Sequence, residues 1–150
     1  MPNSHTEILI HFVFGTRGRL PSIHEECREP LVRYMAGILR NLNCEMLAGK
    51  AVADHAHLLV RLPPSLSVSQ LVRRLKASSS KWVHETFGEE AGFWWQDGYG
   101  AFSVSKSQAS KVIQYIEDQD VHHAETVFTD EYRALIKRHG ISYEERDLIQ

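Results

Sequence analysis

The chain has 150 residues and a mass of 17.2 kDa, a length that suits one domain. Hydrophobic residues make up 43% and charged residues 24%, which excludes a disordered tail, a collagen and a coiled coil. No apolar run approaches the roughly 20 residues of a membrane span, and the polar N-terminus does not resemble a signal peptide. Two cysteines make no disulfide framework. We therefore expect a cytoplasmic single-domain protein that does not contact a membrane.

The formal net charge of −2 hides an uneven distribution along the chain. Residues 1–111 hold thirteen Lys or Arg against ten Asp or Glu, whereas residues 112–150 hold four against nine. A polyanionic partner is therefore expected to meet the first of these segments, unless the charges only keep the surface solvated. Nine histidines is a high count for this length and directs attention to histidines that stand in pairs.

Hydrophobic periodicity, caps and turn residues predict the elements of the fold. In chain order these are a strand over 7–16, a helix from the Ser22 cap to Leu42, strands over 44–52 and 55–62, a helix from Ser67 to Phe87, a strand over 93–104, a helix from Lys106 to about His123 and a short helix around 130–139. The order predicts the α+β class, as a ferredoxin-like split β-α-β arrangement with an antiparallel sheet and helices on one face. We expect one domain over 1–150, with a core of about 5–125 and an acidic C-terminal tail over 126–150.

Two histidines in the predicted strand 55–62 are the strongest chemical signal. Side chains two residues apart on a strand point to the same face, so His55 and His57 are expected side by side. Two imidazoles held in this way can bind one divalent metal ion. The same spacing also suits two histidines on a wetted sheet face, and spacing alone does not decide between the two interpretations.

The predicted helix 106–123 carries a possible third ligand. Tyr115 and Gln119 are four residues apart and share one helix face. Gln119 could offer a carbonyl oxygen to a metal ion, and Tyr115 a phenol oxygen as a nucleophile. Both are also ordinary residues of a helix surface.

These features together resemble a known family. The stretches that carry the resemblance are IHFVFGTRGRLP (Ile10–Pro21), the segment Asp54–Lys76 with its two histidines, FWWQDGYGAFSVS (Phe93–Ser105) and YIEDQ (Tyr115–Gln119). They resemble the single-tyrosine HUH transposases, and more closely the insertion-sequence-200-like transposase family with its REP-associated relatives. Asp54–Lys76 is the most specific stretch, although its Ala56 stands where the family usually has a bulky hydrophobic residue.

The resemblance implies a site and a reaction. His55, His57 and Gln119 would bind a divalent metal ion, Mg²⁺ or Mn²⁺, and Tyr115 would be the nucleophile. Attack of Tyr115 on DNA would leave a free 3′-OH and a 5′-phosphotyrosine, so the chain would cleave and rejoin single-stranded DNA at hairpin-bearing ends. A homodimer is also implied. We identify no side-chain base for Tyr115.

Basic residues are the candidate DNA contacts, because Lys and Arg bind phosphates. We expect contacts from Arg17, Arg19, Arg73, Arg74, Lys81 and Lys111. Trp94, Trp95 and Tyr99 are candidates for stacking on unpaired bases, although part of this group could belong to the core. His11 is expected in the sheet without a catalytic role.

Two other functions remain open at this point. A non-catalytic nucleic-acid-binding module could keep the fold with a spent metal site. A metal-dependent phosphodiesterase that uses water as its nucleophile would not need Tyr115.

Overall fold

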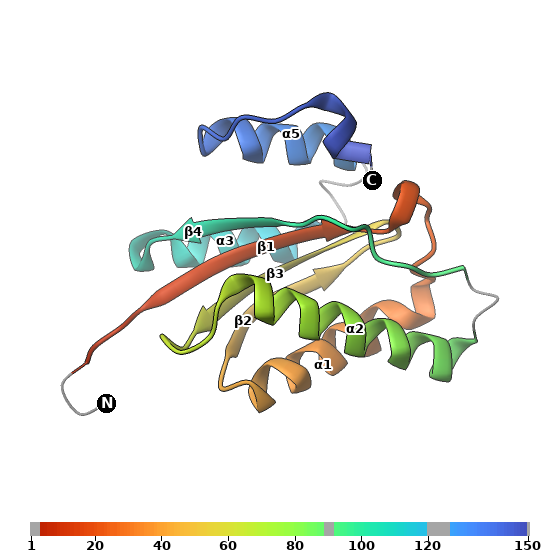
Figure 1. The fold of residues 1–150 in the computed structure, drawn as a ribbon, viewed down its shortest axis with the longest axis horizontal. Helices are drawn as coiled ribbons and strands as arrows, with labels where there is room; N and C mark the ends of the chain where they lie inside the picture. The colour runs from red at the N-terminus through yellow and green to blue at the C-terminus, as the bar shows by residue number, and fades with distance from the viewer. Residues whose placement is uncertain (1–3, 89–91, 120–126, 150) are drawn as a thin grey trace.

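The fold is an antiparallel four-stranded sheet with helices on both faces (Figure 1). The computed structural model describes residues 4–88, 92–119 and 127–149. Its elements are β1 (Ile8–Gly15), η1 (Arg17–Arg19), α1 (Glu25–Asn41), β2 (Glu45–Ala51), β3 (His55–Leu62), α2 (Val68–Phe87), β4 (Gly100–Val104), η3 (Lys106–Gln108), α3 (Ala109–Glu117), α5 (Phe128–Arg138) and η4 (Glu145–Ile149). The strands lie in the order β2-β3-β1-β4, and each neighbouring pair is antiparallel. The predicted α+β class is confirmed.

The alternation of side chains along the central strands gives the sheet two buried faces. Phe12 of β1 and Leu58 of β3 belong to a core cluster with α1 and α2, which cover one face. Val13 packs with residues of α5 on the opposite face, and Leu59 packs there with residues of α3. The prediction of helices on one face holds for α1 and α2. It is wrong for α3 and α5, which bury the opposite face, where the two histidines lie.

The segment expected to be an acidic tail contains a helix that packs on the sheet. The predicted helix around 130–139 is present as α5, above the sheet in Figure 1. Its apolar side is formed by Phe128, Tyr132, Leu135 and Ile136, which are all buried. Their spacing is that of an amphipathic helix, so the acidic composition of the segment does not prevent it from packing on the sheet.

The end of β1 and the following turn make close contacts with α5 and η4. A Cβ atom on Gly15 would lie 2.7 Å from the ring of Phe128, so only glycine permits this close approach. The guanidinium of Arg19 lies 4.5 Å from the centre of the same ring and donates a hydrogen bond to the backbone oxygen of Leu148. These contacts fix α5 and η4 to the rest of the domain.

The predicted strand over 93–104 is shorter in the structure. Regular pairing with β1 covers only Gly100–Val104, and Trp95 forms one isolated bridge with Thr16. The ammonium group of Lys76 on α2 donates to the backbone oxygens of Gln96 and Gly98, at 2.7 Å each, so these carbonyls bond to a side chain. Burial lowers the pKa of Lys76 to about 8.

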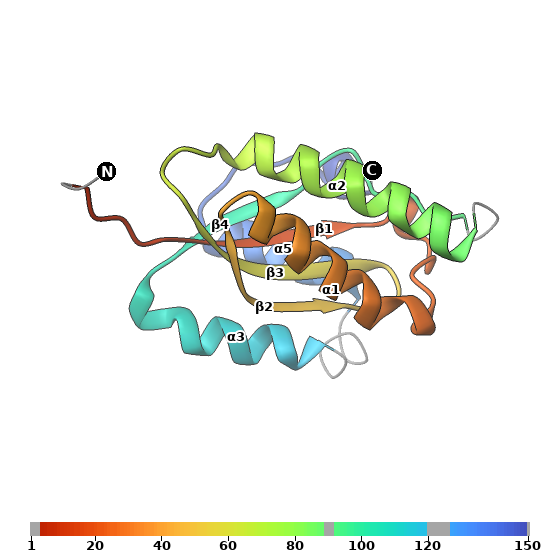
Figure 2. The same ribbon diagram turned by 90° about the horizontal axis from the view of Figure 1, so that it is seen from below.

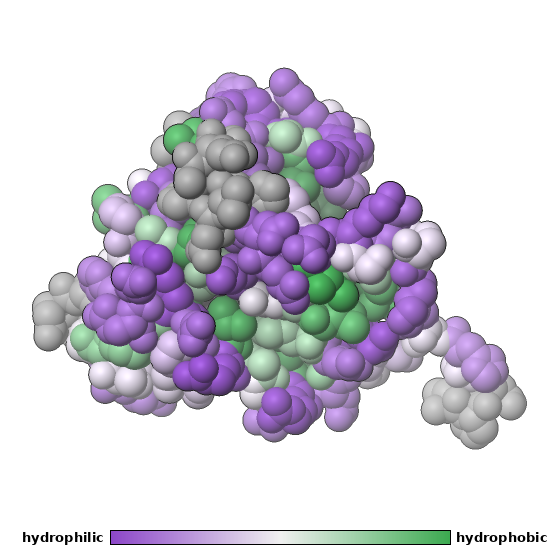
Figure 3. Space-filling view, turned by 180° about the vertical axis from the view of Figure 1, so that it is seen from behind, coloured by the Kyte–Doolittle hydropathy of each residue, from purple (hydrophilic) through white to green (hydrophobic). Residues whose placement is uncertain are grey.

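α3 lies beside β2, at the edge of the sheet farthest from β4 (Figure 2). Its helical residues begin after η3, and the last part of the expected helix, 120–123, lies outside the described residues. Seen from behind, the surface is mostly hydrophilic around an apolar area (Figure 3). Among the described helices, none combines the length and the hydropathy needed to cross a bilayer.

Candidate active site

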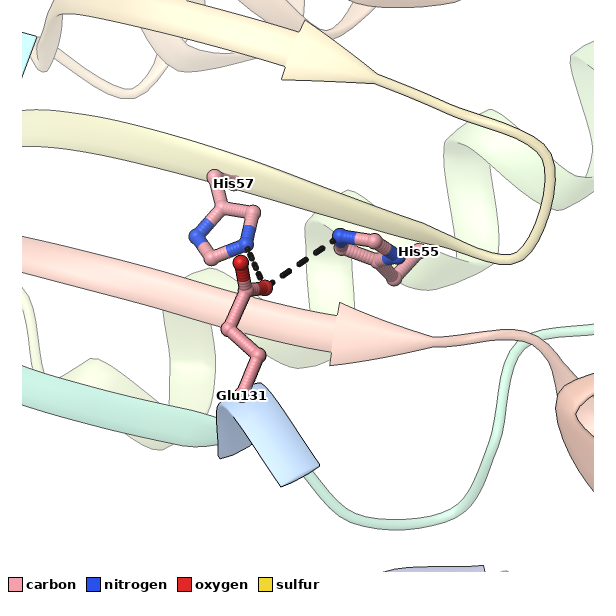
Figure 4. Close-up of side chains that lie close together, drawn as sticks. All are labelled: His55, His57 and Glu131. Carbon is pink, nitrogen blue, oxygen red and sulfur yellow. Dashed lines mark hydrogen bonds and ion pairs between the residues drawn. The ribbon is translucent and has the colours of Figure 1, made fainter. Parts of the chain in front are cut away.

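A buried carboxylate joins the two histidines of β3 (Figure 4). Oε1 of Glu131 lies 2.9 Å from Nε2 of His57 and 3.4 Å from Nε2 of His55. Glu131 is 8% exposed, His57 0% and His55 1%. Each offers one ligand atom, and these atoms lie within 4.8 Å of one another. Two imidazoles and a carboxylate at this separation could hold a divalent metal ion.

The apolar side of α5 determines where Glu131 points. Glu131 lies between Phe128 and Tyr132 on the side of the helix that faces the sheet. The ring of Phe128 stacks on His55, with 4.1 Å between the ring centres and an interplanar angle of 4°. Burial alone would raise the pKa of Glu131, but hydrogen bonds from His55 and His57 outweigh it and hold the pKa well below its usual range. Glu131 is therefore an anion at neutral pH.

His55 is hydrogen-bonded at both ring nitrogens. Its Nδ1 donates to Oδ1 of Asp54 at 2.8 Å, and its Nε2 lies 3.1 Å from Oε1 of Gln119. Burial lowers the pKa of His55, but the hydrogen bonds to Asp54 and Glu131 outweigh it, so the net pKa is raised. The described arrangement therefore favours the protonated ring, whose two N–H groups face oxygen acceptors.

His57 is held by a second histidine. Nε2 of His11 lies 2.8 Å from Nδ1 of His57, and both rings are buried. Burial, with the neighbouring His57, lowers the pKa of His11 to about 3, so His11 is neutral at physiological pH. Because the carboxylate of Glu131 can only accept, a neutral His57 donates from Nε2 and accepts at Nδ1 from His11.

Tyr115 reaches the same site from α3. Its ring centre lies 5.7 Å from that of His57 and 6.2 Å from that of His11. The phenol forms hydrogen bonds with the side chains of Glu131 and Gln119. Burial first, and then the negative charge of Glu131, raise the pKa of Tyr115 above its ordinary value. The neutral phenol is therefore the stable form in this arrangement.

The structure brings His55, His57, Gln119 and Tyr115 together, as the sequence predicts, and adds two residues that sequence reasoning missed. Glu131 falls in the predicted tail, and His11 is expected in the sheet without a role. The available signal for Glu131 is its position within the apolar spacing of 128, 132, 135 and 136. For His11, the signal is its alternation with Phe12 on β1, which puts it on the face of the histidine pair.

The predicted DNA contacts do not form one surface. Arg17, Arg73 and Lys81 gather around Trp94, which is 50% exposed. The guanidinium of Arg17 lies 5.6 Å from the centre of the Trp94 ring. Arg73 and Trp94 line a cavity of about 420 Å³, and Lys81 and Trp94 line a neighbouring one of about 430 Å³. Arg74, also on α2, is exposed and lines neither of these cavities.

The remaining candidates lie apart from this surface. Arg19 is engaged within the chain, because its guanidinium donates to Gln96 and Leu148. Lys111 lies on α3, on the side of Tyr115. Trp95 is in the core, where its Nε1 donates to Ser79 at 2.9 Å, and Tyr99 is half-buried beside Lys76.

The site thus combines a helix tyrosine with a buried histidine pair on an antiparallel α+β sheet. The chain belongs to the family of IS200-like transposases: the family model described as "Transposase IS200 like" matches residues 4–119. α5, with Glu131, lies beyond this match.

Known proteins of this kind are similar over most of the chain. The transposase for insertion sequence element IS200 of Salmonella typhimurium is 34% identical over 119 residues, which cover 73% of this chain and 74% of that relative. The ISDra2 transposase TnpA of Deinococcus radiodurans is 22% identical over 114 residues, 73% of this chain and 81% of the relative.

Two solved structures share the fold. One is a transposase structure from Deinococcus radiodurans, with a TM-score of 0.65 and 23% identity, covering 78% of this chain and 94% of that one. The other is a REP-associated tyrosine transposase bound to a REP hairpin, with a TM-score of 0.60 and 16% identity, covering 81% of this chain and 72% of that one.

Proposed function

We propose that this transposase is a metal-dependent DNA strand transferase that cleaves and rejoins single-stranded DNA through a covalent bond to Tyr115. One observation carries the proposal. The phenol of Tyr115 is hydrogen-bonded to Glu131, and the same carboxylate contacts both His55 and His57. A candidate nucleophile and a candidate metal site thus lie in direct contact within one chain.

The proposed metal ligands are His55, His57 and Gln119, with Glu131 as a further ligand from α5. Carboxylate and amide oxygens suit both Mn²⁺ and Mg²⁺. The two imidazole nitrogens favour Mn²⁺, because Mg²⁺ prefers oxygen ligands. When bound, the ion would polarise the scissile phosphate and stabilise the charge that develops on it. Asp54 and His11 would orient the two imidazoles through their other ring nitrogens.

The chemistry of the chain itself is assigned to Tyr115. Its phenol oxygen would attack phosphorus, which forms an O–P bond to tyrosine and breaks the bond between phosphorus and the 3′ oxygen. The phenol loses its proton, and the departing 3′ oxygen gains one and becomes a free 3′-OH. Because the phosphotyrosine retains the energy of the phosphodiester, a second 3′-OH can reverse the step without ATP.

Single-stranded DNA with hairpin ends is the proposed substrate. It is supported by the likeness to a transposase bound to a REP hairpin and by three cationic side chains, Arg17, Arg73 and Lys81, around the exposed ring of Trp94. Stacking on such a ring with cations close by suits unpaired bases. In the proposed homodimer, Tyr115 would act with the histidine pair of its own chain or with that of the partner chain.

Tyr115→Phe tests the proposal, since it removes one oxygen and keeps the ring. Hairpin-ended strands from palindromes that flank the gene would be incubated with protein and Mn²⁺ and separated on denaturing gels. The unchanged protein should give cleavage and a covalent adduct, and Tyr115→Phe should lose both while still binding DNA. The matched control Tyr34→Phe, on the far face of the sheet, should retain both.

The two other functions give different outcomes in the same assay. Cleavage that persists in Tyr115→Phe would identify a phosphodiesterase that uses water. Binding of these strands without cleavage by either protein would identify a non-catalytic DNA-binding module.

A further inference from the structure

A cavity beside the proposed metal ligands is lined in part by Tyr115 and His11. It has a volume of about 470 Å³ and lies among β4, α3 and α5. Its walls include Phe102, Val104, Lys111, Tyr115, Leu135 and Arg138. The volume is within the range of about 300–1,000 Å³ that small-molecule sites occupy. The cavity therefore has room for a ligand next to the nucleophile.

The charge of this cavity is positive. Lys111 and Arg138 line it, and no Asp or Glu is among the described residues of its wall. Within the described part of the chain neither cation forms an ion pair, whereas Arg133 on the same helix is paired with Asp130 and Glu145. Two uncompensated cations beside one cavity favour an anionic ligand such as a phosphate group.

The rest of the wall combines aliphatic and aromatic groups with polar side chains such as those of Ser103 and Gln108. Phe102 stacks on His139, with 4.6 Å between ring centres and an interplanar angle of 27°. Val104 and Leu135 add aliphatic surface to the same cavity. A flat aromatic base buries its faces well against such a wall, while its phosphate remains near Lys111 and Arg138.

We propose that this cavity is a subsite for one nucleotide of the DNA strand, the one adjacent to the phosphate that Tyr115 attacks. The inference rests on the proposed function, because it assumes that Tyr115 meets a phosphodiester. Arg138 and Tyr115 both line the cavity, so a phosphate bound by Arg138 would lie on the side of the nucleophile. Arg138 and Leu135 lie outside residues 4–119, so α5 completes the subsite from beyond the part of the chain that the family model matches.

The test uses thymidine 5′-monophosphate as the probe and the methyl NMR signals of Val104 and Leu135 as the readout. Saturable shifts of both residues are expected in the full-length protein. Arg138→Ala should weaken binding about tenfold, as expected for the loss of one charge-assisted hydrogen bond. Lys137→Ala removes the same charge from the neighbouring exposed position, which does not line the cavity, and should change the affinity less than twofold.

Two further probes identify the part of the nucleotide that is recognised. Thymidine without phosphate and inorganic phosphate without the nucleoside should each bind at least tenfold more weakly than the nucleotide. Absence of saturable shifts would overturn the proposal. Equal binding of inorganic phosphate would reduce the cavity to an anion site, and equal effects of Lys137→Ala and Arg138→Ala would assign the binding to general electrostatics.

The outcome is separable from that of the proposed function. Nucleotide binding needs no metal, so the probe should bind equally well with and without Mn²⁺. A protein that binds the nucleotide but forms no DNA adduct would contradict the strand-transfer proposal and retain the subsite. A protein that forms the adduct but does not bind the nucleotide would support the strand-transfer proposal and contradict the subsite.

Discussion

Oε1 of Glu131 accepts a hydrogen bond from Nε2 of His57 at 2.9 Å, although the two residues are 74 positions apart in the chain. This contact joins α5 to the strand that carries the histidine pair. It places a carboxylate at the Nε2 atoms of both histidines, where a metal ion would bind.

Glu131→Gln should weaken metal binding, because it replaces an anionic oxygen with a neutral amide of the same shape. We expect the affinity for Mn²⁺ to fall between about tenfold and 100-fold in calorimetric titration, as for other groups that support a metal site. Asp130→Asn is the matched control: it removes the same charge from the adjacent exposed position. Equal affinities of Glu131→Gln and the unchanged protein would remove Glu131 from the ligand set.

Metal binding should strengthen as the pH rises. The pKa of His55 is raised in the metal-free arrangement, so protons compete with the ion at Nε2 until the pH exceeds that raised value. Glu131, whose pKa is held well below its usual range, stays ionised and adds no pH dependence near neutrality. Titration of Mn²⁺ in buffers with different ionisation enthalpies should show proton release. Heats that are the same in all buffers would contradict this expectation.

The same shift of His55 predicts how the metal-free protein responds to pH. Because folding raises the pKa of His55, the protonated ring stabilises the fold fully at pH values below the unfolded pKa, about 6.5. This contribution is lost as the pH rises through the raised folded pKa. His55→Gln should therefore flatten the decline in thermal stability on the alkaline side, and an unchanged profile would argue against a protonated His55.

His11 should orient His57 rather than bind the metal ion. Coordination through Nε2 would move the proton of His57 to Nδ1 and reverse its hydrogen bond with His11, so that Nε2 of His11, 2.8 Å away, would accept it. His11→Phe should lower the Mn²⁺ affinity about tenfold. His11→Gln keeps a polar atom near the position of Nε2 and should recover most of the loss. Equal affinities of the two variants would exclude the positioning role.

The histidine pair and the Tyr115–Gln119 spacing could be predicted because each depends on the period of a single element. Alternation on β3 puts His55 and His57 on one face, and a separation of four puts Tyr115 and Gln119 on one side of a helix. Neither pattern says which elements meet. That these two faces lie together is a property of the tertiary structure.

Glu131 could not be assigned from the sequence for a physical reason. A carboxylate in an acidic segment is usually exposed, and its burial is favourable only when donors such as His55 and His57 face it. The shortening of β4 also depends on a contact between distant elements. The ammonium group of Lys76 on α2 donates hydrogen bonds to the backbone oxygens of Gln96 and Gly98. Both differences arise from contacts between elements that are distant in the sequence.

The cationic surface around Trp94 should determine how DNA binding depends on salt. Replacing Arg73 and Lys81 together with alanine should weaken binding of a single-stranded oligonucleotide. The slope of log affinity against log salt should fall by about 0.7 for each DNA phosphate that the protein no longer neutralises. Arg40→Ala, an exposed cation at the end of α1, is the control with an unchanged slope. A double variant with the slope of the unchanged protein would place the DNA on another surface.

The covalent bond between Tyr115 and DNA can be located on the protein by mass spectrometry. A hairpin-ended strand would be reacted with the protein and Mn²⁺, and the covalent product digested with nuclease and protease before measurement. We predict a nucleotide phosphate attached to the peptide that contains Tyr115, through its phenol oxygen. A nucleotide on any other residue, or cleaved DNA with a free 5′-phosphate and no modified peptide, would contradict the assignment of Tyr115 as the nucleophile.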